Sequence, residues 1–121
     1  KLSFWLLFAM LVSGCAATQM QPVPFALAFE ANSGLSAKLS SEGQQQLALS
    51  ERRALDTSGS ADVVVWNVAS DESGTVTVSQ PFQVGTRECR RLTHAIVRSG
   101  QNLSVVATAC RSGGGSWSYL S

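Results

Sequence analysis

Residues 89–110 read Cys-Arg-Arg-Leu-Thr-His-Ala-Ile-Val-Arg-Ser-Gly-Gln-Asn-Leu-Ser-Val-Val-Ala-Thr-Ala-Cys, a pattern that predicts a β-hairpin. If Ser99 and Gly100 form a two-residue turn, residues whose numbers add up to 199 lie opposite each other. Cys89 and Cys110 are then directly opposed, within the Cα separation of roughly 4.4–6.8 Å that a disulfide requires. We therefore predict a Cys89–Cys110 disulfide. Two free buried thiols are the alternative, and a metal site is disfavoured because no second Cys or His lies at ligand spacing.

The same pairing sorts the hairpin side chains onto two faces of the predicted sheet. One face is apolar apart from a histidine, and it holds Leu92, His94, Ile96, Leu103, Val105 and Ala107. The other face is mixed, and it holds Arg91, Thr93, Ala95, Ser104, Val106 and Thr108. This contrast is typical of a sheet that is covered on one side only.

The chain ahead of the hairpin predicts one helix. Residues 41–44, Ser-Glu-Gly-Gln, have the form of a capping box. The helix is expected to run to about Asp56, because five residues that follow share one side of it. These are Leu47, Ala48, Glu51, Ala54 and Leu55.

Five strands are predicted after this helix, at about residues 63–66, 75–78, 87–98, 102–110 and 116–120. Residues 70–74 form a turn in this interpretation, and Gly113–Gly115 links the last two strands. The predicted fold class is α+β: a small antiparallel β-sheet of about five strands, with one N-terminal helix packed on it and one disulfide.

Residues 1–14 are typical of a bacterial lipoprotein signal peptide. Lys1 supplies a positive charge, and the apolar run at 2–12 is shorter than the roughly 20 residues that a membrane-spanning helix needs. Residues 11–15, Leu-Val-Ser-Gly-Cys, resemble a lipobox, in which small residues precede a cysteine that receives a diacylglyceryl group. We therefore predict that lipid on Cys15 anchors the chain to a membrane. An ordinary secretory signal and a core helix are the alternatives.

Residues 15–39 mix Pro, Gln, Ala and Ser without a sustained period, so we expect a lipid-anchored tether before a disulfide-bonded domain at 40–121. Alternating apolar residues at 25–29 would allow a short strand within the tether. Removal of residues 1–14 takes Lys1 from the nine basic residues, which leaves eight against eight acidic ones. Because the charges balance and the arginines lack a base-stacking aromatic set, no nucleic-acid partner is expected.

Catalytic residues are not expected. His94 is the only histidine, so a Ser-His-Asp or Cys-His scheme would have to use it. The hairpin register places His94 on the apolar face, where a structural role is favoured. Gly113–Gly115 joins two strands, whereas a phosphate-binding loop joins a strand to a helix. We predict that the chain is not an enzyme and needs no cofactor or metal.

The C-terminal part of the chain resembles a known family. The elements that carry the resemblance are Trp66-Asn67, Ser73-Gly74-Thr75-Val76-Thr77, Cys89-Arg90, Ala109-Cys110-Arg111 and Gly115-Ser116-Trp117. They are similar to motifs of the seventeen-kilodalton surface-antigen-like family of outer-membrane lipoproteins, over roughly residues 41–120. The resemblance implies an envelope lipoprotein or surface antigen of the bacterial outer membrane. Residues 16–40 lack the glycine zipper of many members, so a second membrane-inserted element is not expected.

Two functions fit these observations. The first is a structural or interaction lipoprotein that binds another envelope protein or peptidoglycan. The second is a small binding or inhibitor module directed at a hydrolase or a small ligand, for which residues 113–116 form the candidate loop.

The contact surface is predicted from the arginines. If the helix covers the apolar face, Glu51 or Asp56 can pair with Arg90 or Arg98 at the ends of that face. Arg91 lies on the mixed face without such a neighbour. Arg91 is therefore the candidate partner contact.

Overall fold

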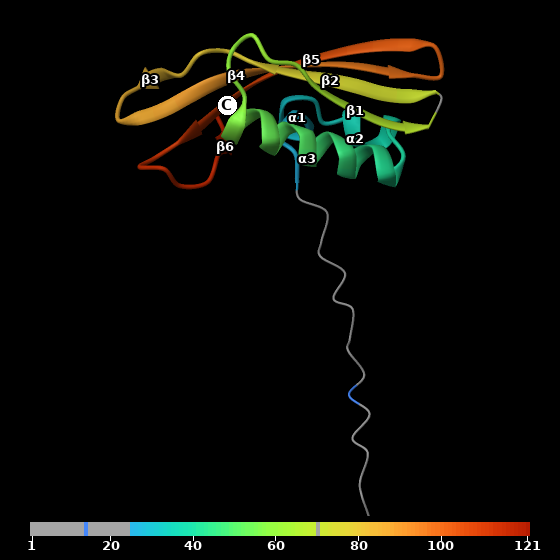
Figure 1. The fold of residues 1–121 in the computed structure, drawn as a ribbon, viewed down its shortest axis with the longest axis horizontal. Helices are drawn as coiled ribbons and strands as arrows, with labels where there is room; N and C mark the ends of the chain where they lie inside the picture. The colour runs from blue at the N-terminus through green and yellow to red at the C-terminus, as the bar shows by residue number, and fades with distance from the viewer. Residues whose placement is uncertain (1–13, 15–24, 70) are drawn as a thin grey trace, which may run out of the picture.

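The computed structural model describes residue 14, residues 25–69 and residues 71–121 (Figure 1). These ranges contain three helices and six strands. They are α1 (Leu27–Ala31), α2 (Leu35–Lys38), α3 (Ser41–Thr57), β1 (Val64–Ala69), β2 (Glu72–Val78), β3 (Phe82–Val84), β4 (Arg87–Arg98), β5 (Gln101–Arg111) and β6 (Ser118–Tyr119). The predicted small antiparallel sheet with a helix on it is confirmed, whereas the prediction of a single helix is wrong.

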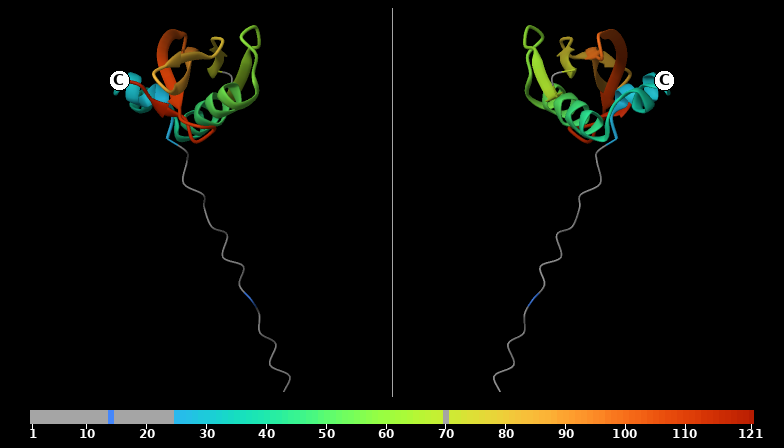
Figure 2. Two further views of the ribbon diagram at one scale, coloured as in Figure 1. Left: turned by 90° about the vertical axis from the view of Figure 1, so that its left-hand side faces the viewer. Right: turned by 90° about the vertical axis from the view of Figure 1, so that its right-hand side faces the viewer.

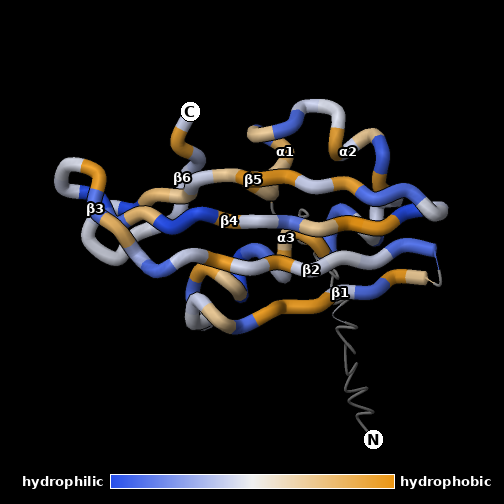
Figure 3. The backbone as a smooth tube through the Cα atoms, turned by 90° about the horizontal axis from the view of Figure 1, so that it is seen from above, coloured by the Kyte–Doolittle hydropathy of each residue, from blue (hydrophilic) through white to orange (hydrophobic). Residues whose placement is uncertain are grey.

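The six strands form one antiparallel sheet in the order β1-β2-β4-β5-β6, with β3 paired to the end of β4. Helix α3 lies across one face of the sheet, and α1 and α2 lie beside β5 (Figures 1 and 2). We call the side that carries α3 the helix face. No helix of the described residues lies over the opposite side, as the view onto the sheet shows (Figure 3). We call that side the open face.

The β4–β5 hairpin has the predicted register. Leu92 lies opposite Ala107, and Cys89 lies opposite Cys110. The turn residues Ser99 and Gly100 have φ angles of 48° and 76°, the left-handed conformation that a type I′ turn requires at both positions. The Sγ atoms of Cys89 and Cys110 are 2.06 Å apart, so the predicted disulfide is present.

The core lies between α3 and the sheet, as the apolar pattern predicted. Leu47 of α3 and Leu92 of β4 are fully buried. They belong to one apolar cluster, which also contains Ala48, Leu55, Ile96 and Val105. Leu103, which we also expected under the helix, lies partly buried at the margin of this cluster.

The start of α3 differs from the prediction by one residue. The N-cap is Ser40, whose Oγ accepts a hydrogen bond of 3.0 Å from the backbone N–H of Gly43. The side chain of Gln44 donates instead to the carbonyls of Ser36 and Leu39. The capping-box interpretation is therefore wrong, because the Gln44 amide joins α3 to the α2 segment.

The segment before α3 contains two short helices in place of the expected tether and strand. Helices α1 and α2 have only five and four residues, too few to show a helical period in the sequence. Their apolar side chains nevertheless enter the core, and the buried ones within 26–39 are Ala26, Leu27, Ala28, Phe29, Leu35 and Leu39. Helix α1 packs on β5. Residues 26–39 are therefore part of the domain.

The N-terminal predictions concern residues that the structure does not describe. Cys15 and residues 16–24 lie outside the described ranges, as do residues 1–13 of the predicted signal peptide. Across the described part of the chain, no helix has the length and apolar character needed to cross a membrane.

Two details of the strands also differ from the prediction. Gly74, which we placed in a turn, lies in β2 opposite Trp66 of β1. The Trp66 indole occupies the space beside it, since a Cβ on Gly74 would lie 2.6 Å from ring atoms. Strand β3, Phe82–Val84, which pairs with β4, was not predicted. Its three residues are too few to show an alternating pattern in the sequence.

Candidate functional site

The helix face contains a buried pair of ionisable side chains, Glu51 of α3 and His94 of β4. His94 is fully buried, and its Nε2 lies 2.8 Å from Oε2 of Glu51. Because a carboxylate can only accept, Nε2 carries the hydrogen of this bond. The same carboxylate accepts from the backbone N–H groups of Leu27 and Ala28, at 2.6 and 3.2 Å. Glu51 therefore joins α1, α3 and β4.

This arrangement agrees with the structural role that we predicted for His94. Both side chains are buried, and both Glu51 oxygens are already engaged by hydrogen-bond donors. The sequence prediction missed this pair, although the sequence itself contained a signal for it. Glu51 interrupts the apolar side of the predicted helix, His94 interrupts the apolar face of the hairpin, and these two surfaces pack together.

The arginines at the ends of the helix face have partners other than those predicted. Arg90 is buried, and its guanidinium donates to the carbonyls of Leu55, Ser58 and Ser79 at 3.1, 2.8 and 2.9 Å. The bonds to Leu55 and Ser58 satisfy carbonyls at the C-terminal end of α3, where a cation is also favourable for the helix dipole. The predicted pairing of Arg90 with Glu51 or Asp56 is therefore wrong.

Arg98 pairs with Glu72 of β2, at 3.4 Å, and donates to the carbonyl of Lys38. Glu72 also accepts a hydrogen bond of 2.7 Å from the hydroxyl of Ser40, the N-cap of α3. The predicted pairing of Arg98 with an acidic residue of α3 is wrong. Glu72 takes that place because it lies opposite Arg98 in the β2–β4 ladder.

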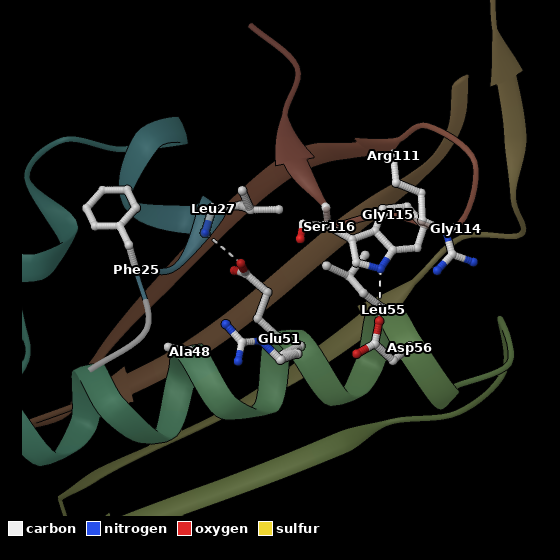
Figure 4. A pocket seen from close by; sticks show the side chains of 12 residues that line it. Phe25, Leu27, Ala48, Glu51, Leu55, Asp56, Arg111, Gly114, Gly115 and Ser116 are labelled. Carbon is white, nitrogen blue, oxygen red and sulfur yellow. Dashed lines mark hydrogen bonds between the residues drawn. The ribbon is translucent and has the colours of Figure 1, made fainter. Parts of the chain in front are cut away.

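A groove of about 610 Å³ opens beside Glu51, between α1, α3 and the loop that joins β5 to β6 (Figure 4). Its lining includes the apolar side chains of Phe25, Leu27, Ala48, Leu55 and Trp117. Its charged lining consists of Glu51, Arg52, Asp56 and Arg111. The volume and the mixed lining fall in the range of small-ligand sites.

The β6 end of the groove is held by contacts of Trp117. The indole N–H donates to Asp56 at 3.0 Å, which fixes the β5–β6 loop to α3. The guanidinium of Arg111 lies 4.5 Å from the ring centroid of Trp117, a cation–π contact, and bonds to Glu88 at 3.2 Å. The sequence prediction missed this cluster, because Trp117 and Asp56 are 61 residues apart and carry no spacing signal. Arg52 makes no ion pair within the described residues.

The open face is rich in β-branched side chains. Val65, Val97 and Val106 are 62, 42 and 55% exposed on it. Arg91 lies on the same face and is exposed, as predicted from the register. Its side chain makes no hydrogen bond within the described residues, whereas its backbone N–H donates to the Ser79 hydroxyl at 2.9 Å and its carbonyl accepts from the Ser79 N–H at 2.8 Å. The structure thus separates Arg91 from Arg90, which lies on the helix face.

The fold and these sites define a small disulfide-bonded domain with one helix-covered face and one open face. A family model described as 17 kDa outer membrane surface antigen matches residues 53–118, which is more than half of the chain. The chain belongs to this family, as the resemblance of its cysteine and tryptophan motifs indicated. Neither the curated proteins nor the solved structures contain a match to the chain.

Proposed function

We propose that the chain is a lipid-anchored outer-membrane lipoprotein whose domain binds another component of the cell envelope through its open face. The family supplies the coarser part of this proposal, an outer-membrane surface antigen. The lipobox at residues 11–15 supports anchoring through Cys15.

The observation that carries the binding proposal is the composition of the open face. Exposed valines on a surface that no described helix covers offer apolar area for a partner, and Arg91 offers one cation for orientation. On the helix face, Arg90, His94 and Glu72 are engaged in hydrogen bonds that hold the domain together. An envelope protein or peptidoglycan is the proposed partner, with Arg91 at the contact.

The anchor is tested by Cys15→Ala. This change is expected to abolish labelling of the protein by a fatty-acid probe and to leave an unprocessed or soluble product. Ser13→Ala, which keeps a small residue before the cysteine, is the control and should still be labelled. Labelling of the Cys15→Ala protein would contradict the proposal.

The open face is tested by comparing the native protein with Arg91→Glu in pull-downs from solubilised envelopes and in binding to purified peptidoglycan. We expect Arg91→Glu to lose most of the bound partner while remaining folded. Arg53→Glu, an exposed reversal on α3, is the matched control. Equal recovery with all three proteins would exclude the open face as the contact.

The groove supports a second function, a small binding or inhibitor module. Trp117 and Arg111 place an aromatic and a cationic group beside the loop at 113–116. An inhibitor of a hydrolase is expected to co-purify with a soluble enzyme and to lose it in Trp117→Ala. Capture of envelope components by both the native protein and Trp117→Ala would favour the first function.

A further inference from the structure

The surface of α3 that points away from the sheet has an apolar centre with basic neighbours. Leu49 is 43% exposed there. Its neighbours one turn further along, Arg52 and Arg53, are exposed and make no ion pair in the part of the chain that the structure describes. One turn before Leu49 lie Gln45 and Gln46. Glu51 is buried under the helix, and the nearest exposed carboxylates on α3, Glu42 and Asp56, are two turns from Leu49, where Asp56 accepts from Trp117.

The chain enters the domain on this same side. Phe25, the first residue of the continuous described segment, lines the groove beside α3 (Figure 4) and is 68% exposed. Its ring contacts Phe29 of α1 edge to face, with a centroid separation of 5.8 Å. Phe25 and Leu49 are thus two exposed apolar side chains on the helix side, whereas Val65, Val97 and Val106 lie on the opposite one.

We infer that Phe25, Leu49, Arg52 and Arg53 form a membrane-facing surface that lies on the phospholipid bilayer. The inference rests on the proposed anchoring through Cys15. Nine residues lie between Cys15 and Phe25, and the ten Cα–Cα steps that join them span at most roughly 35 Å even when fully extended. The anchored domain therefore stays close to the bilayer, and the attachment at Phe25 presents the α3 side to it.

The chemistry of the surface matches a phospholipid headgroup layer. Phenylalanine and leucine enter the boundary between headgroups and acyl chains, and arginines bind lipid phosphates. Within one turn of Leu49 the only carboxylate of α3 is the buried Glu51, so no exposed carboxylate there repels those phosphates. In this orientation the open face, with Arg91, points away from the bilayer and is free for a partner in the envelope.

Two labelled variants of the purified lipoprotein test this orientation. Leu49→Cys and Val65→Cys each add one free thiol, because Cys89 and Cys110 are bonded and Cys15 is alkylated. A spin label is attached to each thiol, and its accessibility to two relaxation reagents is measured in phospholipid vesicles. Oxygen concentrates in the lipid, whereas a nickel complex stays in the water. We expect the label at position 49 to respond to oxygen and the label at position 65 to nickel. Nickel access at position 49, or lipid contact at position 65, would overturn the inference.

A charge reversal sharpens the test. Arg52→Glu combined with Arg53→Glu is expected to shift the label at position 49 from oxygen to nickel access on anionic vesicles. Arg91→Glu on the opposite side is the matched control and should leave both labels unchanged. A label at position 49 that is shielded from both reagents would indicate a protein occupant, such as a second copy, and would also overturn the inference.

Mass spectrometry of the purified protein keeps this inference separate from the proposed function. An unmodified Cys15 contradicts the anchor itself. A lipidated Cys15 with a water-exposed label at position 49 contradicts only the membrane-facing surface. Unfolding curves of the variants should match that of the native protein, since all the substituted side chains are exposed.

Discussion

On the helix face of the sheet, most polar side chains are buried and hydrogen-bonded, whereas the open face exposes valines and Arg91, whose side chain makes no hydrogen bond within the described residues. Arg90 and Arg91 show the difference at adjacent positions. The guanidinium of Arg90 donates to backbone carbonyls at the end of α3, whereas the side chain of Arg91 is exposed to solvent. Because side chains alternate between the faces of a strand, one step along β4 separates a group that maintains the fold from one that is available for binding.

The largest effect is expected at Glu51 on the helix face. Glu51→Ala leaves His94 Nε2 and the N–H groups of Leu27 and Ala28 without their acceptor. Each buried donor left without an acceptor costs about 1–3 kcal/mol, and Glu51→Ala leaves three of them, so urea unfolding should move to a much lower midpoint. Glu51→Gln retains one acceptor oxygen and should lose less. A Glu51→Ala protein of native stability would mean that the pair does not hold α1 in place.

The disulfide is the main stabilising feature that the open face contains. By the register, Cys89 and Cys110 share a face with Arg91, yet both are fully buried. The bond spans 21 residues, and its removal in the Cys89→Ser, Cys110→Ser protein is expected to cost about 3 kcal/mol. Non-reduced peptide mapping checks the connectivity. Two free thiols in protein from the envelope would show that the open face contributes no covalent constraint.

A smaller effect is expected where β1 and β2 meet. Gly74→Ala forces a methyl group against the Trp66 indole on the helix face and should cost about 1–3 kcal/mol. Ser73→Ala, one residue away on the open face, is the control and should change the free energy of unfolding by less than about 0.5 kcal/mol. Tryptophan fluorescence during denaturant unfolding measures both. Equal effects at the two positions would contradict the difference between the faces.

The smallest effect on stability is expected at Arg91. Arg91→Glu should change the free energy of unfolding by less than about 0.5 kcal/mol, because the side chain makes no hydrogen bond within the described residues. Arg90→Ala, its neighbour, removes bonds to several carbonyls and should cost about 2 kcal/mol or more. A thermal unfolding series compares them. If Arg91→Glu is the more destabilised protein, the two faces have been assigned the wrong way round.

The sequence alone predicted the features that depend on residues close together in the chain. The register of the β4–β5 hairpin follows from one two-residue turn and a period of two, and the disulfide follows from that register. Helix α3 follows from the residues between Leu47 and Leu55 that share one side of it. These signals are reliable because each is repeated several times within one element, so a single unusual residue does not remove it.

Only the tertiary structure decided which remote groups meet. Helices α1 and α2 are too short to show a period, and they form where the core and the Glu51 carboxylate hold them. Glu51 binds His94, which is 43 residues away, rather than an arginine. Trp117 binds Asp56, which is 61 residues away, at one end of the groove. A charged residue has many potential partners along the chain. The choice among them depends on which surfaces the packed sheet brings together, and no local pattern records that choice.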